Sequence, residues 1–339
     1  MNQNRHTIYD LMQMQSLPLD IKVKMTQRRI REFYDHFDGQ VCLSFSGGKD
    51  STVLKHIIDN MYDDVPSVFC NTGLEYPEIQ KFAMNSPNTI TVRPKRSFRE
   101  IIEGYGYPVI SKEVSKNVYY ARKDGEDSLY YQKLFGTLMY KGEKSMLCSD
   151  KWKFLYDAPF PISHWCCKFL KKQPMITFQN KNKLYPLLAT MASESRLRTS
   201  AWLMTGCNVF EGDAKSTPMA FWTDQDVLRY IVKYDVEICS VYGDIVPKRD
   251  IEGQMDFMDM CEGCEDTYET TGADRTGCIF CMFGVHLDKK PNRFQRLKET
   301  HPKQYDYCIN GGEMRDGQWL PNKKGLGLGK VLDYIGVEY

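Results

Sequence analysis

The residues with the clearest chemical potential are those of Ser44-Phe45-Ser46-Gly47-Gly48-Lys49-Asp50-Ser51-Thr52. They lie between an apolar run that predicts a β-strand over 40–45 and an amphipathic run that predicts a helix over 50–61. Adjacent glycines let the backbone turn tightly and approach a ligand closely. The helix that follows would point its first amides, and the positive end of its dipole, at one spot. We therefore predict a phosphate or pyrophosphate site built from Ser44, Ser46, Gly47, Gly48, Lys49, Asp50, Ser51 and Thr52.

The elements that must position this loop form an alternating pattern. Predicted strands at 67–70, 89–92, 185–191 and 218–222 follow the first strand, and an amphipathic helix at 20–37 precedes it. Ser97 with Glu100, and Thr223 with Asp226, predict capping boxes that begin two further helices. Alternation of this kind predicts an α/β fold with an open, mostly parallel, twisted sheet and helices on both faces. Ligands then lie beyond the carboxyl ends of the strands, where the residues 44–52 and 71–78 both fall, so that one site can use both.

The chain has 339 residues, which allows one large domain or two. We divide it into an N-terminal helical segment (1–37), a nucleotide-binding α/β domain (38–240) with a helical region inserted at about 105–180, and a cysteine-rich C-terminal region and tail (241–339). The net charge is +1, and no apolar run is long enough to span a membrane. The N-terminus lacks the apolar core of a secretory signal, so we expect a cytoplasmic protein with no membrane partner.

Ser46-Gly47-Gly48-Lys49-Asp50-Ser51 resembles the pyrophosphate loop (PP-loop) of the adenine nucleotide α-hydrolases. It is not the P-loop of common ATPases, because Leu43 occupies the position of that motif's first glycine. The superfamily contains ATP pyrophosphatases and the reductases of phosphoadenosine phosphosulfate (PAPS) and adenosine phosphosulfate (APS). The resemblance implies binding of an adenine nucleotide, either ATP or APS/PAPS.

Other segments resemble the PAPS reductase family in the same order. Residues 71–78, NTGLEYPE, resemble its Asp-Thr-Gly-x-x-Phe/Tyr-Pro-Glu segment, with Asn71 in place of the usual Asp. Residues 193–198 look like its Glu-Ser-x-x-Arg segment, a source of arginine for substrate phosphates, and 218–231 resemble its Pro-Leu-x-x-Trp-Thr-x-x-Asp-Val segment. The resemblance adds five residues to the predicted nucleotide site: Thr72, Gly73, Glu75, Arg196 and Arg198.

Four cysteines resemble the ligand set of the iron–sulfur type of these reductases. They are the adjacent Cys166 and Cys167 and the distant pair Cys278 and Cys281. Such a set can supply the four thiolates of a [4Fe–4S] cluster if the fold brings the two pairs together. The alternative is Zn²⁺, because thirteen residues separate the pair Cys261 and Cys264 from the pair Cys278 and Cys281, close to zinc-ribbon spacing. Cys166 and Cys167 would then be buried core thiols.

Three functions are compatible with this pattern. In the favoured one, the loop holds the pyrophosphate of ATP, Lys49 and Asp50 act in catalysis, and Asp50 or Glu75 helps to hold Mg²⁺. An adenylated acceptor then receives sulfur. In the second, a cysteine thiolate attacks the sulfate sulfur of APS or PAPS. The reductases carry that cysteine in a Glu-Cys-Gly-x-His segment that is absent here, which leaves Cys308, followed by two mobile glycines, as the candidate. The third is a nucleotide-binding or sensor module without turnover.

Two basic and aromatic segments are candidates for contact with a nucleic-acid acceptor. Lys112, Lys116, Arg122 and Lys123 are interleaved with Tyr119 and Tyr120, and residues 291–298 add a second mixture. The ordinary interpretation is a solvated helix face with its aromatic residues turned inward. The favoured chemistry also requires a sulfur donor protein, and the reductase chemistry requires a reductant protein.

Overall fold

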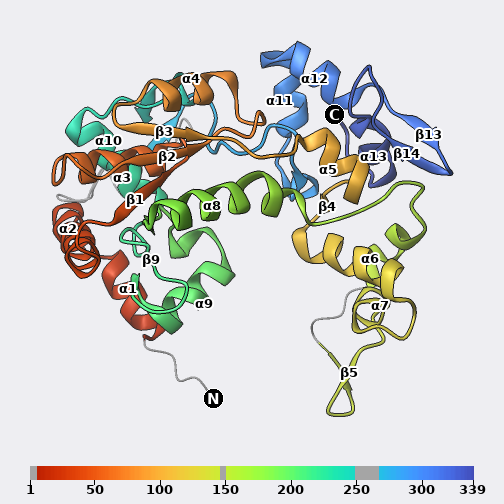
Figure 1. Cartoon of the computed structure of the whole chain (residues 1–339), viewed down its shortest axis with the longest axis horizontal. Helices are drawn as coiled ribbons and strands as arrows, with labels where there is room; N and C mark the ends of the chain where they lie inside the picture. Colours follow the sequence, from red (N-terminus) through yellow and green to blue (C-terminus); the bar gives the residue numbers. More distant parts are fainter. Residues whose placement is uncertain (1–5, 146–149, 249–266) are drawn as a thin grey trace, which may run out of the picture. The chain divides into compact units, whose positions relative to one another are not determined.

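The structure is a computed structural model that describes residues 6–145, 150–248 and 267–339. Its chain forms two compact units, which we describe separately (Figure 1). The first unit comprises Met1–Asn71, Tyr76–Val92 and Met175–Thr276. The second comprises Thr72–Glu75, Arg93–Pro174 and Gly277–Tyr339.

A six-stranded sheet organises the first unit. Its order is β3-β2-β1-β7-β9-β8, with the bounds Thr89–Val92, Ser67–Cys70, Val41–Phe45, Tyr185–Leu187, Lys215–Ser216 and Asn208–Val209. Four of the five strand pairings are parallel, and the pairing of β8 with β9 is antiparallel. The predicted open, mostly parallel sheet is therefore confirmed. Since β1 lies inside the sheet, its carboxyl end delivers residues 46–48 to the edge where ligands bind in such folds.

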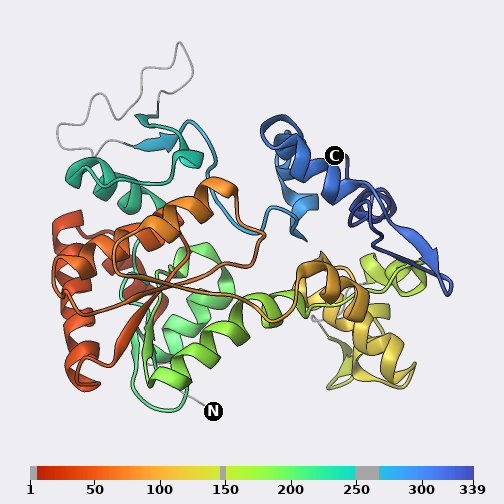
Figure 2. The same ribbon diagram turned by 45° about the horizontal axis from the view of Figure 1, so that its top comes forward.

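Helices cover both sides of this sheet. They are α1 (Ile8–Gln15), α2 (Leu19–His36), α3 (Lys49–Asp59), α4 (Pro77–Asn85), α8 (Gln173–Asn182), α9 (Arg196–Thr205) and α10 (Asp224–Tyr234). In Figure 1 and again in Figure 2, α4 and α8 lie on opposite sides of the strands. The core between the layers contains Ile30, Phe33, Leu43, Leu54 and Trp222, all almost fully buried. Burial of these large side chains supplies most of the driving force for this arrangement.

Local sequence signals placed several helix starts correctly. Thr223 and Asp226 form the predicted capping box of α10, and Ser97 and Glu100 form that of α5 in the second unit. The strand predicted at 218–222 is wrong. Residues 217–222 form successive tight turns, in which the Ala220 amide donates to the Thr217 carbonyl and the Trp222 amide to the Met219 carbonyl. Their apolar side chains are buried as in a strand, and for this reason the sequence pattern predicted a strand where the chain forms turns.

The second unit joins two segments that the sequence analysis treated as separate. Residues 93–174 contribute α5 (Phe98–Tyr105), β4 (Val109–Ile110), α6 (Lys112–Asp124), α7 (Leu129–Phe135), the hairpin of β5 (Met139–Tyr140) and β6 (Glu143–Lys144), the 3₁₀ helix η1 (Asp150–Asp157) and the π-helix η2 (Lys168–Lys172). Residues 277–339 contribute β12 (Met282–Phe283), α11 (Arg293–Thr300), α12 (Pro302–Ile309), β13 (Glu313–Arg315), β14 (Gln318–Leu320) and α13 (Leu328–Tyr334).

Non-local pairing holds these segments together. Strand β4 pairs in parallel with β12, and the buried Tyr107 hydroxyl donates to the Leu326 carbonyl at 2.8 Å. The division of the chain into units therefore differs from the predicted one. The inserted region packs with the C-terminal residues 277–339, whereas the described residues 241–248 and 267–276 belong to the first unit. Pairings of this sequence separation leave no local periodicity, so composition alone could not reveal them.

Candidate functional site

The turn between β1 and α3 has the strained geometry that its glycines predict. Gly47 has φ +72°, and a Cβ on it would lie 3.0 Å from Ile79 Cγ2 and 3.2 Å from the Ile79 carbonyl oxygen. Any larger residue would therefore collide with α4 as well as strain the backbone. Gly48 is the N-cap of α3, so the first amides of that helix open directly into the turn.

Hydroxyl groups inside the turn bind one another and the backbone. Ser46 Oγ and Ser51 Oγ are 2.9 Å apart, and the Gly48 amide donates to Ser46 Oγ at 3.3 Å. The hydroxyls of Ser51 and Thr52 each donate to the Gly48 carbonyl at 3.0 Å. These contacts stabilise the loop conformation. Of the predicted hydroxyl donors, Ser51 and Thr52 are therefore already used to shape the site.

Lys49 is the buried cation of the loop. Its Nζ donates to Asp50 Oδ1 at 2.8 Å and to Asp224 Oδ1 at 3.2 Å, and its side chain is 6% exposed. Burial lowers the pKa of Lys49, but the two carboxylates outweigh it and the pKa is raised overall. Asp224 begins α10 and carries no motif of its own. Sequence reasoning therefore missed it, although its neighbours in the Thr223 capping box were recognised.

A cavity of about 380 Å³, here called the loop cavity, adjoins this cation. Its size is within the range of small-ligand sites. Its lining comprises Ser44, Ser46, Gly48, Lys49, Asp50, Ser51, Leu188, Ala189, Thr190, Glu194, Arg198, Tyr242, Arg275 and Thr276. The loop cavity thus gathers most of the residues predicted from the 44–52 segment, together with the predicted Arg198.

Two arginines share one carboxylate in the wall of the loop cavity. Arg275 Nη2 lies 2.9 Å from Glu194 Oε1, and Arg198 pairs with Glu194 Oε2. Burial and then the neighbouring Arg275 lower the pKa of Arg198, while Asp50 raises it. Arg275 comes from a segment without any nucleotide-binding pattern, so no sequence signal indicates it. Three cationic side chains, Lys49, Arg198 and Arg275, therefore line a cavity suited to a polyanion.

Tyr242 closes one side of the turn. Its hydroxyl accepts a hydrogen bond from the Lys49 amide at 3.1 Å and lies 2.7 Å from Thr276 Oγ1. The side chain is buried, and burial raises the pKa of its hydroxyl. The Lys49 amide is one of those that a phosphate at the helix N-terminus would bind. An incoming phosphate oxygen would therefore compete with the Tyr242 hydroxyl for the Lys49 amide.

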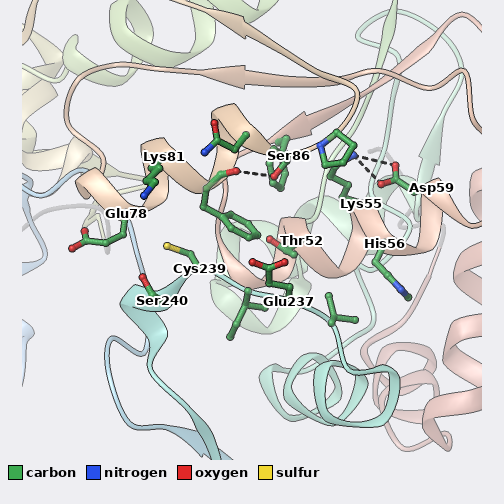
Figure 3. A pocket seen from close by; sticks show the side chains of 16 residues that line it. Thr52, Lys55, His56, Asp59, Glu78, Lys81, Ser86, Glu237, Cys239 and Ser240 are labelled. Carbon is green, nitrogen blue, oxygen red and sulfur yellow. Dashed lines mark hydrogen bonds and ion pairs between the residues drawn. The ribbon is translucent and has the colours of Figure 1, made fainter.

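A larger cavity of about 600 Å³ is lined in part by Thr52, Lys55 and Asp59 of α3 (Figure 3). Its lining mixes both signs of charge, with Lys55 and Lys81 beside Asp59, Glu78 and Glu237. Lys55 Nζ is 2.8 Å from Asp59 Oδ2, which neutralises it locally. Thr52, predicted to contact nucleotide, lines this cavity instead of the loop cavity. The smaller loop cavity is the better candidate for a polyanion because it contains the helix amides and two arginines that share a single carboxylate.

The remaining predicted nucleotide ligands lie elsewhere. Thr72, Gly73 and Glu75 belong to the second unit, where Glu75 accepts hydrogen bonds from the Thr72 amide at 3.0 Å and from its hydroxyl at 2.8 Å. That residues 44–52 and 71–78 form one site stays a prediction. Arg196 is exposed at the start of α9 and does not line the loop cavity.

The four cysteines predicted to bind a cluster come together in the second unit. They line a small space, here called the cysteine pocket, with Leu74, Phe98, Pro108, Cys166, Cys167, Leu170, Lys171, Cys278, Phe280 and Cys281 as its lining. Residues 107–110 bring the two pairs together. Tyr107 bridges to Ile162 on the side of Cys166, while β4 pairs with β12 immediately after Cys281.

Backbone contacts hold the Cys-x-x-Cys turn in place. The Ile279 amide donates to the Leu74 carbonyl at 2.7 Å, and the Cys281 amide donates to the Cys278 carbonyl at 3.0 Å. Arg293 donates to the carbonyls of Cys281 and Phe283, each at 3.1 Å, and is fixed in turn by a bidentate pair with Asp288. The basic segment 291–298 therefore contributes a structural arginine to this pocket.

The four thiols of the cysteine pocket are the donor type that a [4Fe–4S] cluster and Zn²⁺ both use. Tetrahedral Zn²⁺ with Zn–S bonds of about 2.3 Å needs sulfurs about 3.8 Å apart. Cys166 Sγ and Cys167 Sγ are 3.9 Å apart, but within the described part of the chain no third metal-binding side chain joins them at that range. A cube separates its thiolates more widely, because each binds a different iron. The pocket, at about 20 Å³, would have to widen to admit one.

The thiols differ in acidity. Burial raises the pKa of Cys278 to about 11 and also raises the pKa of Cys281. The hydrogen bond between Cys166 and Cys167 lowers the pKa of Cys167 and raises that of Cys166, and Lys112 and Lys171 add to the lowering at Cys167. One thiol of the adjacent pair is thus the readiest to lose its proton, which metal ligation requires.

The remaining predicted cysteines are the catalytic candidate Cys308 and the zinc candidates Cys261 and Cys264. Cys308 is fully buried within α12, and burial raises its pKa well above the ordinary value. The sequence analysis had placed it on a mobile glycine-containing tail, whereas a reactive thiolate requires exposure and a positive neighbourhood. Cys261 and Cys264, the additional ligands of the zinc alternative, lie outside the described residues.

The first unit is therefore an α/β nucleotide-binding fold whose loop cavity is formed at the carboxyl end of β1. Residues 40–116 match the model of the phosphoadenosine phosphosulfate reductase domain. This match confirms the predicted family for that part of the chain, which carries a domain of the PAPS reductase family.

Individual relatives are distant. The chain is 22% identical over 272 residues to the uncharacterized protein MJ0973 of Methanocaldococcus jannaschii, an alignment that covers 79% of this chain and 46% of that relative. The chain thus spans about half the length of this curated relative. A crystal structure of PAPS reductase from Candida auris, in a phosphate complex, aligns with a TM-score of 0.36 and 16% identity over 66% of this chain and 91% of that one. In the described residues, no helix is both long and apolar enough to cross a membrane.

Proposed function

We propose that the protein is an enzyme that binds ATP in the loop cavity, cleaves it at the α-phosphate and couples this adenylation to sulfur transfer. The observation that carries the proposal is the buried Lys49 at the amide end of α3, facing the same cavity as Arg198 and Arg275. A triphosphate carries several negative charges, and this set offers amides, a lysine and two arginines to them. Residues 40–116 belong to a family of nucleotide-binding domains, which supports the assignment.

The residues of the loop cavity would act by position and charge. The amides of α3 and Lys49 hold the β- and γ-phosphates, and the arginines neutralise charge that develops as pyrophosphate leaves. Asp50 and Asp224 would hold Mg²⁺ together with the phosphates, since Mg²⁺ in nucleotide sites uses one or two carboxylates. Magnesium would supply further charge neutralisation at the bridging oxygen.

The chemistry balances without a redox step at the nucleotide. An acceptor oxygen forms a bond to the α-phosphorus while the bond to the β-phosphate oxygen breaks, and pyrophosphate leaves with the electron pair. A sulfide sulfur from a donor protein then attacks the acceptor carbon, and AMP leaves with the former acceptor oxygen. We propose nucleic acid as the acceptor class. Cys166, Cys167, Cys278 and Cys281 would hold a [4Fe–4S] cluster, which would bind or orient sulfur when present.

Reduction of APS or PAPS is the second candidate, and the family match over residues 40–116 favours it. This reaction needs a thiolate that reaches the sulfate sulfur. The buried Cys308 does not meet that requirement, so we rank this candidate below adenylation. A nucleotide-binding module without turnover is the third candidate, and it predicts binding alone.

One pair of assays separates the three candidates. Purified protein is given ATP, Mg²⁺ and labelled pyrophosphate, with and without transfer RNA or DNA, and in parallel APS or PAPS with a thiol reductant. Exchange of label into ATP supports adenylation, release of sulfite supports the reductase, and nucleotide binding with neither supports the silent module. Lys49→Ala should lower exchange at least about 100-fold.

Lys55→Met is the matched control for that variant. Lys55 lies on the same helix and is also buried, but it faces the larger cavity and pairs with Asp59. Its loss should leave exchange within about threefold of the unaltered protein, which is the scale of a weak surface effect. Equal losses in both variants would show that stability of α3, and not the loop cavity, is being measured.

A further inference from the structure

A continuous row of partly exposed rings crosses the second unit. We call it the aromatic strip and define it by Tyr130, Tyr120, Tyr119, His164, Trp165, Phe169 and Tyr105. Ring centroids are 4.7 Å apart for Tyr130 and Tyr120, 5.9 Å for Tyr120 and His164, and 4.5 Å for His164 and Trp165. The row continues through Phe169, 5.9 Å from Trp165, to Tyr105 at 4.9 Å. Core aromatics of the same unit, such as Phe160, are by contrast fully buried.

Cations lie over the rings along the whole row. Lys116 Nζ is 5.3 Å from the centroid of Tyr130, and Lys168 Nζ is 4.4 Å from that of Trp165. Arg96 lies 5.3 Å from the centroid of Phe169 and donates to the Tyr105 hydroxyl at 2.8 Å. Each cation therefore sits beside a π-face, so a base that stacks on the ring meets a positive charge for its phosphate.

The positive charge of the chain is concentrated in the segment that forms the aromatic strip. Residues 93–174 contain 16 Lys and Arg against nine Asp and Glu, a formal net charge of +7, whereas the whole chain has +1. The nearly neutral total therefore conceals a basic region. A basic segment that also carries exposed aromatic residues has the composition of a nucleic-acid surface.

Two polar atoms inside the strip have unused hydrogen-bonding capacity. His164 Nδ1 and Trp165 Nε1 are buried, and neither has a hydrogen-bond partner among the described residues. An unpaired buried polar atom is costly and usually indicates a missing partner. Both atoms belong to adjacent residues at the centre of the row, between Lys116 and Lys168.

We propose that the aromatic strip binds single-stranded nucleic acid, with bases stacked on its rings and phosphates paired with Arg96, Lys116 and Lys168. A single strand fits better than a duplex, because duplex bases are already stacked on one another. The proposal deepens the proposed function, on which it rests for the identity of the acceptor, but the binding itself requires no ATP. Arg122, a predicted contact, is excluded because it donates to four backbone carbonyls of the second unit.

The test is a fluorescence anisotropy titration of the full chain with labelled twelve-nucleotide oligomers: single-stranded DNA, single-stranded RNA and the matching DNA duplex. We expect saturable binding of a single strand, at least tenfold tighter than that of the duplex, and the two single-stranded arms decide between DNA and RNA. Tyr120→Leu should weaken binding about tenfold, the scale of one lost base–ring stack. Lys116→Gln should reduce the slope of log affinity against log salt by about 0.7.

Matched variants isolate the strip from general charge and folding. Lys303→Gln removes an exposed charge from α12 of the same unit, and Phe154→Leu removes a partly exposed ring outside the strip, so both should bind as the unaltered protein does. Equal losses in Lys303→Gln and Lys116→Gln, tight binding to the duplex, or no saturable binding at 50 mM salt would each overturn the proposal, because phosphate contacts are strong at that concentration. If the protein bound heparin equally well with and without Tyr120→Leu, and showed no preference for single strands, the strip would instead bind an acidic protein partner.

The outcome is separable from that of the proposed function. Lys49→Ala should retain full oligomer affinity, because Lys49 belongs to the loop cavity of the other unit. If oligomers bind but no pyrophosphate exchange occurs, the proposed function fails and the strip assignment stands. If exchange occurs without oligomer binding, the strip assignment alone fails.

Discussion

The loop cavity and the cysteine pocket are built in opposite ways. Six of the fourteen residues that line the first come from the single stretch 44–51, and the cavity is polar, with about 380 Å³ of space. The second is assembled from four segments separated by up to about two hundred residues, and its cavity is apolar and about 20 Å³. The first can receive a soluble ligand as it stands. The second requires its ligands to converge and would have to open for a cluster.

This difference has an energetic counterpart. In the loop cavity, Lys49 is already neutralised by Asp50 and Asp224, so an incoming polyanion must compete with carboxylates. In the cysteine pocket, three of the four thiols have raised pKa values, so deprotonation is the obstacle. Binding of a nucleotide would therefore replace the contacts of Lys49 with carboxylates by contacts with phosphates. Binding of a metal centre would require the thiols to lose their protons. The predictions below test each side of this contrast.

The largest effect is expected from removal of two cysteine ligands. Cys278→Ser combined with Cys281→Ser should abolish bound metal, because a cluster loses half of its thiolates. Elemental analysis of iron and zinc on anaerobically purified protein is the measurement. Cys308→Ala, which alters a buried thiol outside the cysteine pocket, should keep its metal. Retention of metal in Cys166→Ser with Cys167→Ser, and its loss in Cys261→Ser with Cys264→Ser, would establish the zinc alternative.

A buried ion pair between α2 and α10 gives the next largest effect. Lys22 Nζ lies 2.7 Å from Asp226 Oδ2, and both side chains are 3% exposed. Lys22→Met leaves a buried carboxylate at the start of α10, so the free energy of unfolding should fall by about 3–5 kcal/mol. Urea denaturation followed by circular dichroism measures it. Lys233→Ala breaks the exposed pair with Asp20 and should cost at most about 1 kcal/mol; similar losses would contradict the buried-pair argument.

Arg275→Ala tests the wall of the loop cavity. One charge-assisted contact to a phosphate is lost, and we expect affinity for ATP to fall about tenfold. Isothermal titration calorimetry with ATP and Mg²⁺ gives the dissociation constant. Arg196→Ala is the control, because Arg196 is exposed and outside the cavity. If Arg196→Ala lowered the affinity for ATP and Arg275→Ala did not, Arg196 would be the phosphate ligand, as the sequence resemblance indicated.

Tyr242→Phe should give the smallest effect, but the direction of the change decides the role of the Tyr242 hydroxyl. Without its hydroxyl, the Lys49 amide is released from the acceptor that it now binds. Pyrophosphate should then bind about threefold more tightly, since one neutral hydrogen bond no longer competes. The same calorimetric titration with pyrophosphate measures this change. Weaker binding would mean that the Tyr242 hydroxyl is itself a phosphate ligand.

The contrast also explains how far the sequence could predict the site. The 44–52 segment carries its geometry locally, because glycines and a helix start specify the turn, and the predicted loop residues were found together around it. Asp224, Tyr242 and Arg275 reach the same cavity only through tertiary packing, which leaves no spacing to recognise. The cysteines could be named as candidate ligands from their residue type and spacing. Their convergence depends on the pairing of β4 with β12, which no local pattern encodes.

The same reasoning accounts for the errors. Residues 218–222 are apolar and buried as turns, so their pattern could not be distinguished from a strand. Arg122 was expected at a nucleic-acid surface, but its guanidinium binds the carbonyls of Leu155, Tyr156, Ala158 and Phe160. Such a role depends on where a distant loop folds, and the residue type alone does not reveal it.

Residues 107–110 are flanked by Ile162 on one side and by β12 on the other, and this has a consequence for biosynthesis. While the ribosome is still adding the last quarter of the polypeptide, one flank has no neighbour and the two cysteine pairs remain apart. Loading of metal would then be a late event, after release of the finished chain. Shortage of iron during growth should accordingly leave full-length, sheet-containing protein that can be charged with metal afterwards.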